Sequence, residues 1–336
     1  MEQIKVGLIG CGRFGTMHGE VLSDLETVEL CAVADPAFGD RAARPAWAEG
    51  VAWYSDYREL LARDDIQAVH ICIPDREHVE VLEAAIDADK HIFVEKPLTH
   101  TSASAMRMYE RSRQSRKKHT VGFILRFNPA SVLARESIRS GAIGDIVYVS
   151  SRRVSPMSGG IRYGNVSNLA IHSCVHDIDL ARWLVGSEYR SVFSRCRRET
   201  LRCRGIDTQD VLLSSYELEN GVIYSQENSW ALAPSYPYFV DGSMQVIGTK
   251  GSLHIDYRSQ GLMCYDEDRV SHPDLHHWPS LSGRRSGDLR AEIEHFHRAI
   301  RRDEEVRVSF YDGYVATLVA EAVLQSVDRR QEITIG

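Results

Sequence analysis

The chain has 336 residues, a net charge of −7 and an ordinary globular composition, with 43% hydrophobic and 26% charged residues. This length predicts about two domains, each with enough apolar residues for a core. The acidic balance argues against nucleic acid as a partner, and no apolar run approaches the roughly 18–20 residues that cross a bilayer. Seven cysteines, an odd number without C-x-x-C spacing, indicate reduced thiols in a cytoplasmic protein.

The first third of the chain alternates strand and helix patterns. Strands are expected at 4–9, 28–34, 68–73, 91–94 and 120–125, and helices at 15–25, 77–88 and 102–116. Strands that alternate with helices predict parallel βαβ units in a doubly wound sheet. The fold class is therefore α/β, with an N-terminal dinucleotide-binding type of sheet.

Beyond residue 125 strands follow one another with few helices between them. They are expected at 146–153, 191–197, 210–218, 222–230, 244–248 and 252–257, and helices at 168–185, 288–301 and 314–327. Consecutive strands separated by turn signals predict a mostly antiparallel sheet. Residues 265–287, rich in His, Pro, Ser and Gly, are expected to form an irregular surface loop. The predicted domains are 1–124 and 125–336, with the terminal helix at about 314–327 able to pack back on the first.

A glycine-rich loop, Gly10-Cys11-Gly12-Arg13-Phe14-Gly15, follows the first strand and opens a helix. In this context G-x-G-x-x-G is typical of a dinucleotide site. Gly10 permits the tight turn, Gly12 lets the backbone approach a pyrophosphate, and Gly15 allows close packing of helix on strand. Free amides at the helix start would face the phosphates.

Asp35 stands twenty residues after Gly15, at the end of the second strand. An acidic residue there accepts hydrogen bonds from the ribose hydroxyls and repels a 2′-phosphate. NAD is therefore expected in preference to NADP. Arg41 and Arg44 are the nearby residues that could hold a 2′-phosphate instead.

A second motif, Glu95-Lys96-Pro97, follows the strand at 91–94. Its Lys lies at the carboxyl end of a parallel strand, where doubly wound folds bind ligands. A cation there can hydrogen-bond a substrate hydroxyl and stabilise the developing alkoxide. A surface Lys before a turn Pro is the alternative that spacing alone leaves open.

His172, His176 and Asp179 stand at i, i+4 and i+7 of a predicted helix, which would place them on one face. Three interpretations compete. A zinc site would resemble H-E-x-x-H, but Ser173 stands where the Glu would be, so no metal is expected. A structural helix would use the His residues only to fill polar gaps. Acid–base catalysis is favoured, because an imidazole with a pKa of about 6.5 suits proton removal from an alcohol.

These motifs together resemble the Gfo/Idh/MocA family of oxidoreductases, the group of glucose-fructose oxidoreductase and inositol dehydrogenase. The resemblance runs nearly end to end. It rests on residues 10–15, on Cys72-Ile73-Pro74 followed by His78, on Glu95-Lys96-Pro97, on Val175-His176-Asp177-Ile178-Asp179-Leu180 followed by Arg182-Trp183-Leu184, and on Glu321-Ala322.

The resemblance implies a Rossmann domain followed by an α/β domain whose open sheet often forms a subunit interface. It implies that Lys96 contacts substrate, that the Lys96–Pro97 bond is cis, and that His176 binds substrate and transfers a proton. Many relatives have Asp at the position of His172. A His there cannot supply the same fixed negative charge, so a relay, a substrate contact and a spacer all stay open as roles for it.

The remaining site residues complete this assignment. The catalytic residues are expected to be Lys96 and His176. The cofactor-binding residues are expected to be Gly10, Gly12, Arg13, Phe14, Gly15, Asp35, Ile73, Pro74, His78, Glu95 and Lys96. The substrate-binding residues are expected to be Lys96, Arg126, Asn128, Tyr163, Asn165, His172, His176 and Tyr236. His276, His277, His295 and His297 are expected at the surface or between helices, not as ligands.

The favoured function is NAD-dependent hydride transfer between the nicotinamide and a secondary alcohol of a sugar, cyclitol or derivative. The same site run in reverse would be a keto-sugar reductase. A non-catalytic sensor of the same fold is a second hypothesis, although a sensor has no need for both Lys96 and His176. A reductase of a non-sugar ring is a third. The partners expected are a small polar substrate and further copies of the chain, as a homodimer or homotetramer, with neither nucleic acid nor membrane.

Overall fold

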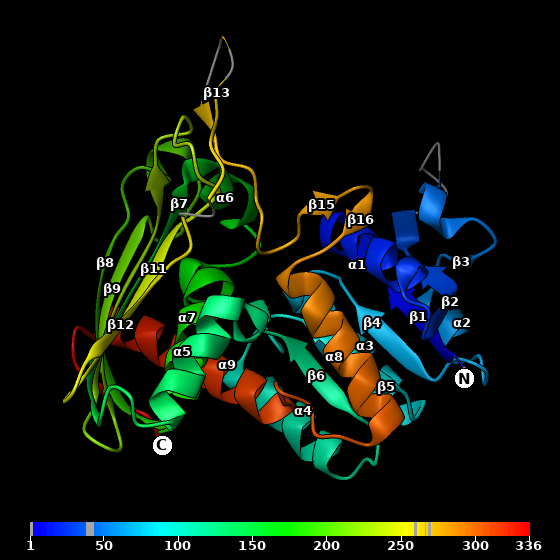
Figure 1. Cartoon of the computed structure of the whole chain (residues 1–336), viewed down its shortest axis with the longest axis horizontal. Coiled ribbons are helices and arrows are strands. Elements are labelled where there is room, and N and C mark those ends of the chain that lie inside the picture. The colour runs from blue at the N-terminus through cyan, green and yellow to red at the C-terminus, as the bar shows by residue number, and fades with distance from the viewer. Residues whose placement is uncertain (1–2, 38–43, 259–260, 266, 268–269) are drawn as a thin grey trace. The chain divides into compact units, whose positions relative to one another are not determined.

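Six short apolar strands in the N-terminal part pair side by side in the order β3-β2-β1-β4-β5-β6, all parallel (Figure 1). The computed structural model describes residues 3–37, 44–258, 261–265, 267 and 270–336. The strands are β1 (Ile4–Ile9), β2 (Val28–Ala34), β3 (Ala52–Tyr54), β4 (Ala68–Ile71), β5 (His91–Glu95) and β6 (His119–Gly122). This order confirms the predicted doubly wound parallel sheet.

Helices follow most of these strands. They are α1 (Arg13–Asp24), α2 (Tyr57–Leu61), α3 (His78–Asp87) and α4 (Ser102–Arg113), with short 3₁₀ turns η2 (Ala46–Ala48), η3 (Asp75–Glu77) and η4 (Ile124–Phe127). These strands contain fully buried residues, such as Leu8, Ile71 and Val94, so they read as continuous apolar runs. The pattern missed β3 and α2 because three- and five-residue elements carry too few periods to stand out.

The molecule divides into two compact units, residues 1–127 with 276–314 and residues 128–275 with 315–336. This division differs from the expected 1–124 and 125–336, because 276–314 contributes to the first unit. Helix α8 (Asp288–Arg302) contacts α1 and η4 there. Its Phe296 ring lies 5.8 Å from that of Phe93 on β5.

The second unit is built on a seven-stranded sheet in the order β12-β11-β7-β10-β9-β8-β17. Its strands are β7 (Ile146–Pro156), β8 (Tyr189–Arg197), β9 (Val211–Leu218), β10 (Ile223–Leu232), β11 (Asp241–Gly248), β12 (Ser252–Asp256) and β17 (Ile333–Thr334). Only β7 and β10 pair in parallel within it; its other pairs are antiparallel. The mostly antiparallel open sheet of the prediction is confirmed.

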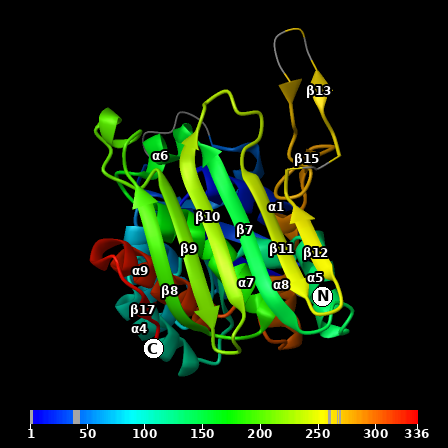
Figure 2. The same ribbon diagram turned by 90° about the vertical axis from the view of Figure 1, so that its left-hand side faces the viewer.

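Helices α5 (Pro129–Arg139), α6 (Met157–Tyr163) and α7 (Val175–Val185) belong to this second unit, as does most of α9 (Phe310–Arg329). Figure 2 looks onto the sheet face that these helices leave uncovered. Several apolar side chains are about half exposed along the strands, namely Val147, Leu213 and Ile223. The short helices α5 and α6 are further elements that the sequence pattern missed.

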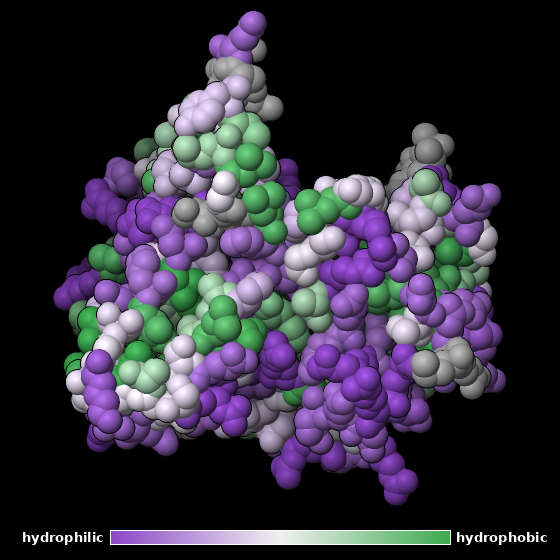
Figure 3. Space-filling model, viewed as in Figure 1, coloured by the Kyte–Doolittle hydropathy of each residue, from purple (hydrophilic) through white to green (hydrophobic). Residues whose placement is uncertain are grey.

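The segment expected as an irregular loop, 265–287, holds parts of two short hairpins. They are β13 (Cys264–Tyr265) with β14 (Val270–Ser271), and β15 (Ser280–Leu281) with β16 (Arg284–Arg285). Among the residues that the structure describes, no helix has the length and apolar character to span a membrane. The face drawn in Figure 3 interleaves hydrophilic and hydrophobic residues.

Candidate active site

The glycine loop of the first unit has the backbone geometry that a nucleotide site needs. Gly10 has a φ of +86°, and a Cβ there would lie 2.5 Å from the carbonyl oxygen of Cys72. A Cβ on Gly15 would lie 2.0 Å from the Gly10 carbonyl oxygen, whereas a Cβ on Gly12 would meet nothing within 4 Å. Gly10 and Gly15 are thus required by packing, and Gly12 keeps open space before α1. These features fit a bound pyrophosphate.

Asp35 lies directly beside this loop. Its side chain is buried, and its Oδ2 accepts the Cys11 backbone N–H at 2.6 Å while its Oδ1 accepts the N–H of Ala37 at 2.9 Å. Each carboxylate oxygen has a second lone pair, so the group can still accept from ribose hydroxyls. Arg44 lies over the Trp53 ring, with its guanidinium carbon 5.8 Å from the ring centre. Arg41 lies outside the described residues.

Arg13 and Phe14 begin α1, and Phe14 contacts a residue that the sequence did not single out. The Trp278 ring packs edge-on against Phe14, with centroids 5.5 Å apart. Trp278 belongs to the segment containing β15 and β16, which is tied to α1 by the Arg285–Glu20 and Arg284–Asp24 ion pairs at 2.6 and 2.8 Å. These arginines are more than 250 residues from Glu20 and Asp24 in sequence, so no local sequence pattern predicts the contact with α1.

The hydrogen bonds from Arg284 and then from Arg290 lower the pKa of the Asp24 carboxyl. The two arginines flank the start of α8, and both reach the last turn of α1. The ion pairs therefore hold the 276–287 segment and α8 against the helix that begins at the glycine loop.

His78 lies between two loops instead of facing outward. Its buried ring has Nε2 3.1 Å from the carbonyl oxygen of Ile73 and Nδ1 2.9 Å from that of Pro97. Burial lowers the pKa of His78. Ile73 and Pro74 form the turn after β4, so this imidazole ties that turn to the Glu95-Lys96-Pro97 segment.

Lys96 follows the last residue of β5, at the carboxyl end of the parallel sheet. The Lys96–Pro97 peptide bond is cis, which confirms what the family resemblance implied. The Lys96 side chain is partly exposed. A cation at this edge of the sheet stands where doubly wound folds place their ligands.

In the second unit the predicted helix 168–185 begins with a π-helical turn, Ala170–Cys174, before α7 starts at Val175. Within this π turn the backbone hydrogen bonds run from i to i+5, where an α-helix has i to i+4. That His172, His176 and Asp179 share one face stays a prediction. His172 and His176 are partly exposed, whereas Asp179 is buried.

His172 packs in a small aromatic group. Its ring stacks on Tyr163 with centroids 4.3 Å apart and an interplanar angle of 25°. The buried Trp230 ring lies 5.6 Å from His172. Two predicted substrate residues, Tyr163 and His172, are thus neighbours, and Tyr163 is placed by the end of α6.

A buried ion pair anchors the turn that carries His176. Asp177 accepts from Arg153 at both carboxylate oxygens, at 2.7 and 2.9 Å, and its side chain is 1% exposed. The Gln226 amide of β10 donates to the carbonyl of Cys174 at 3.0 Å. Arg153 and Gln226 hold this turn in place, and the sequence pattern did not single them out. Their signal was a charged and an amide side chain within predicted strands.

The other predicted substrate residues have contacts within their own units. Arg126 is buried and donates to Asp312 Oδ1 at 2.9 Å. Asn128 caps α5 by accepting the Ala130 N–H at 3.0 Å. The Tyr236 hydroxyl donates to Asp241 at 2.9 Å.

Burial and that hydrogen bond to Asp241 raise the pKa of Tyr236. Asn165 is exposed in the segment before the π turn. Arg126 and Asn128 thus have clear structural duties, whereas Asn165 is open to solvent. Across the described ranges, no three His, Cys, Asp or Glu side chains are grouped to hold a metal ion.

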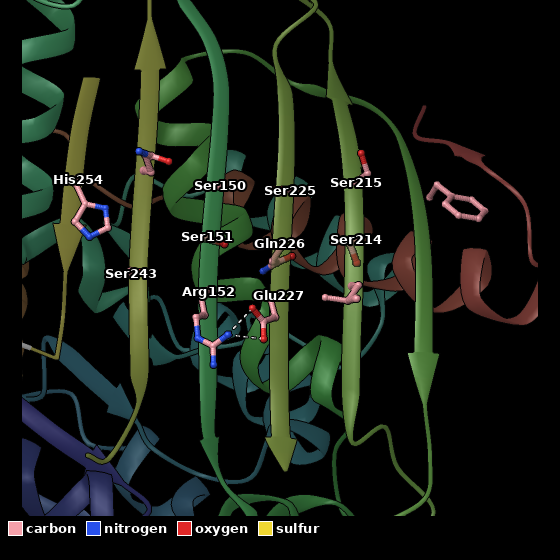
Figure 4. A pocket seen from close by; sticks show the side chains of 13 residues that line it. Ser150, Ser151, Arg152, Ser214, Ser215, Ser225, Gln226, Glu227, Ser243 and His254 are labelled. Carbon is pink, nitrogen blue, oxygen red and sulfur yellow. Dashed lines mark hydrogen bonds and ion pairs between the residues drawn. The ribbon is translucent and has the colours of Figure 1, made fainter. Parts of the chain in front are cut away.

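A pocket of about 530 Å³ lies on the sheet of the second unit, and most of its lining residues are Ser, Gln or charged residues (Figure 4). It is lined from β7 to β12, and Arg152 and Glu227 pair across it at 2.6 Å. None of the predicted site residues lines it. One lining residue, Gln226, also donates to the Cys174 carbonyl in the turn before His176.

Comparisons with known proteins agree with the motifs. A family model described as "Oxidoreductase family, NAD-binding Rossmann fold" matches residues 4–123, and one described as "Oxidoreductase family, C-terminal alpha/beta domain" matches residues 135–335. Inositol 2-dehydrogenase of Rhizobium meliloti (strain 1021) is 29% identical over 344 residues, which cover 99% of each chain.

A second relative, inositol 2-dehydrogenase 2 of Saccharopolyspora erythraea, is 31% identical over 329 residues, 96% of this chain and 93% of the relative. The crystal structure of myo-inositol 2-dehydrogenase from Lactobacillus plantarum has a TM-score of 0.85 at 21% identity and covers all of both chains, so the fold is the same. The chain therefore belongs to the Gfo/Idh/MocA family of oxidoreductases, and its first domain is an NAD-binding Rossmann fold.

Proposed function

We propose that the protein is an NAD-dependent dehydrogenase that acts on a ring secondary alcohol of a cyclitol, or of a sugar or its derivative. The observation that carries the proposal is Lys96 at the carboxyl end of β5, in a unit whose glycine loop fits a dinucleotide. Two relatives named as inositol dehydrogenases, aligned over nearly the whole chain, support a cyclitol as the first substrate class.

The first unit would hold the cofactor by its backbone. Amides at the start of α1 would bind the pyrophosphate beside Gly12, and Asp35 would accept from the adenosine ribose, which favours NAD over NADP. Arg13, Phe14, Ile73, Pro74 and Glu95 would line this site, with His78 holding its loops. When bound, NAD supplies the hydride acceptor.

Lys96 and His176 would act on the reacting hydroxyl. The Lys96 ammonium would donate to the hydroxyl oxygen and stabilise the negative charge that develops there. His176 would accept the hydroxyl proton, for which a neutral imidazole is suited. The Arg153–Asp177 pair supports this role because it fixes the helical turn that carries His176.

The substrate ring would be recognised by polar and aromatic side chains of the second unit. The Tyr163–His172 stack offers a flat face with ring nitrogens at its edge, which suits a hydroxylated ring. We assign Asn165 and Tyr236 to the same task as polar contacts. Arg126 and Asn128 stay assigned as substrate residues, beside the internal contacts described above.

We also propose that the protein is a cytoplasmic homo-oligomer, dimeric or tetrameric. The uncovered face of the second sheet presents Val147, Leu213 and Ile223, each more than half exposed, and apolar patches of this kind mark association surfaces. Free thiols at Cys196, Cys203 and Cys264 suit a reducing compartment.

The test is a screen of NAD reduction, followed by NADH absorbance, across inositols, aldoses, aminosugars and sugar phosphates. We expect turnover with at least one cyclitol or sugar and a clear preference for NAD over NADP. Tight binding of NADH and of a polyol, without turnover in either direction, would favour the sensor and contradict the proposal. Activity confined to a non-sugar ring ketone would also contradict it.

A further inference from the structure

Three buried histidines of the first unit stand in line and end on Glu95, the residue before Lys96. His18 of α1 has Nε2 3.1 Å from Glu95 Oε1 and Nδ1 2.9 Å from Nδ1 of His70, on β4. His70 Nε2 lies 3.1 Å from Nε2 of His297, on α8. The chain Glu95–His18–His70–His297 thus joins a helix, two strands and the late helix α8.

The histidine chain is closed to solvent except at one end. His18 and His70 are fully buried and His297 is 1% exposed, whereas the Glu95 side chain is 13% exposed. Burial, reinforced by the neighbouring imidazoles, lowers the pKa of His70 well below its usual value. Burial also lowers the pKa of His297 to about 3. These two rings are therefore neutral at physiological pH.

One arrangement of three neutral rings supplies a proton to every contact. An ionised carboxylate only accepts, so His18 must donate from Nε2 and accept at Nδ1. His70 must then donate from Nδ1 and accept at Nε2, and His297 must donate from Nε2. Its Nδ1 carries no proton, and this nitrogen finds no partner among the described residues.

The opposite arrangement is disfavoured at the far end. If His18 were an imidazolium, His70 would accept at Nδ1 and donate from Nε2, and His297 would carry its proton on Nδ1. That N–H would be buried without an acceptor, and a buried donor without an acceptor is unfavourable. The lone nitrogen at His297 therefore fixes the direction of the whole chain.

We infer that His18, His70 and His297 are positioning residues that aim every hydrogen bond at Glu95 and so hold its carboxylate as an acceptor for the nicotinamide ribose hydroxyls. This rests on the proposed function for the placing of the ribose at Glu95. A ribose hydroxyl is a donor that a fixed carboxylate binds well. The chain leaves the second Glu95 oxygen for that contact, since His18 contacts Oε1.

The first test reads the tautomers directly. Long-range ¹H–¹⁵N NMR spectra of the full chain with ¹⁵N-labelled histidine, assigned by single His variants, report which ring nitrogen carries the proton. We expect Nε2–H for His18 and His297 and the less common Nδ1–H for His70. An Nε2–H signal from His70 would overturn the direction of the chain.

The second test measures NADH binding by fluorescence in a matched pair. His18→Leu removes the donor to Glu95, and we expect the Kd of NADH to rise about tenfold, the worth of one hydrogen bond to a charged group. His18→Gln keeps a donor near the Nε2 position and should recover the affinity to within about threefold. Equal Kd values for wild type and His18→Leu would contradict the positioning role.

A second pair tests transmission through a residue that does not touch Glu95. His70→Asn keeps a donor near the Nδ1 position, whereas His70→Leu, of similar size, has none. We expect a higher Kd of NADH in His70→Leu than in His70→Asn. If both variants lose thermal stability but have the same Kd of NADH, the buried histidines serve only core packing and the inference is wrong.

The binding readout separates this inference from the proposed function. NADH binding that follows the pairs, in a protein that turns over no polyol, keeps the inference and removes the proposed substrate class. Normal polyol turnover together with unchanged NADH binding in His18→Leu keeps the proposed function and removes the inference about the histidines. If both leucine variants fail to fold, the wild-type tautomers still decide.

Discussion

In the first unit the nucleotide site is made by backbone geometry, whereas in the second unit side chains anchor the helix that carries His176. Position 10 requires glycine because a Cβ there would clash with the Cys72 carbonyl, and position 15 requires it because a Cβ would clash with the Gly10 carbonyl. The helical turn that carries His176, in contrast, is anchored by the ion pair between Arg153 of β7 and Asp177 of α7. Local backbone rules are readable in a sequence, while long-range pairings are not. The two regions should therefore fail in different ways when they are altered.

The largest contrast is expected on acidification. Burial lowers the pKa of His91, His119 and His295 to about 4 and that of His297 to about 3, and all four lie in the first unit. A histidine in the unfolded chain has a pKa of about 6.5, so the unfolded state is stabilised relative to the folded state as pH falls below that value. We expect the free energy of unfolding to drop by more than about 4 kcal/mol between pH 6.5 and about 4.

Hydrogen exchange by mass spectrometry can locate that loss. Protection should fade in β4, β5 and α8 before it fades in β9 and β10. Simultaneous loss in both units at every pH would mean that the buried histidines do not set the acid limit. A denaturant titration at pH 7 provides the reference stability.

The second contrast concerns the ion pair. Asp177→Asn leaves Arg153 as a buried charge with a weakened partner, and breaking such pairs costs about 3–5 kcal/mol. The double variant Arg153→Met, Asp177→Leu should recover most of that stability. We expect it to fold but to lose turnover, because the turn carrying His176 is no longer anchored. Wild-type turnover in the folded double variant would remove the positioning role of the pair.

Lys96→Ala and His176→Ala test one residue from each unit. Each should lower kcat by more than about 100-fold, the usual effect of losing an acid–base group, and His176→Ala should keep its NADH affinity nearly intact. Lys117→Ala, which removes a surface cation paired with Asp89, serves as the control and should keep full turnover. Near-normal kcat in both test variants would end the proposed mechanism.

A matched glycine pair separates packing from access in the first unit. Gly15→Ala forces a Cβ to 2.0 Å from the Gly10 carbonyl and should cost about 1–3 kcal/mol of stability. Gly12→Ala meets nothing within 4 Å, so its melting temperature should hold while NADH affinity falls. If Gly12→Ala binds NADH like the wild type, the pyrophosphate does not approach at this residue.

The smallest effect is expected from Asp35→Ser. Removing the carboxylate should narrow the preference for NAD over NADP by about tenfold, because one charged acceptor near the ribose is lost. The ratio of kcat/KM for the two cofactors measures it. A wild-type enzyme that already prefers NADP would show that Asp35 does not select the cofactor.

Much of the first unit could be predicted because its determinants are local. β1 and β2 run over the predicted residues, since each is a short apolar run bounded by turn residues. The three glycines had roles that follow from φ and from the size of a Cβ. The cis Lys96–Pro97 bond was available only through the family resemblance.

The remainder depends on contacts between distant residues. The π turn at Ala170–Cys174 has no local signature, and Gln226, which bonds to its last carbonyl, lies some fifty residues away in sequence. Trp278 reaches Phe14 from the other end of the chain. His297, expected at the surface or between helices, is buried against His70. Periodicity cannot reveal such pairs.

The late position of α8 has a consequence for how the protein is made. On the ribosome the six parallel strands emerge first, but the helix that supplies Phe296 and His297 to them follows only after the whole seven-stranded sheet except β17. At typical elongation rates of about 5–20 residues per second, the interval is roughly 10–30 s. During this interval the nascent nucleotide domain exposes the surface that α8 later covers. A chaperone that shields this surface would therefore bind during this interval.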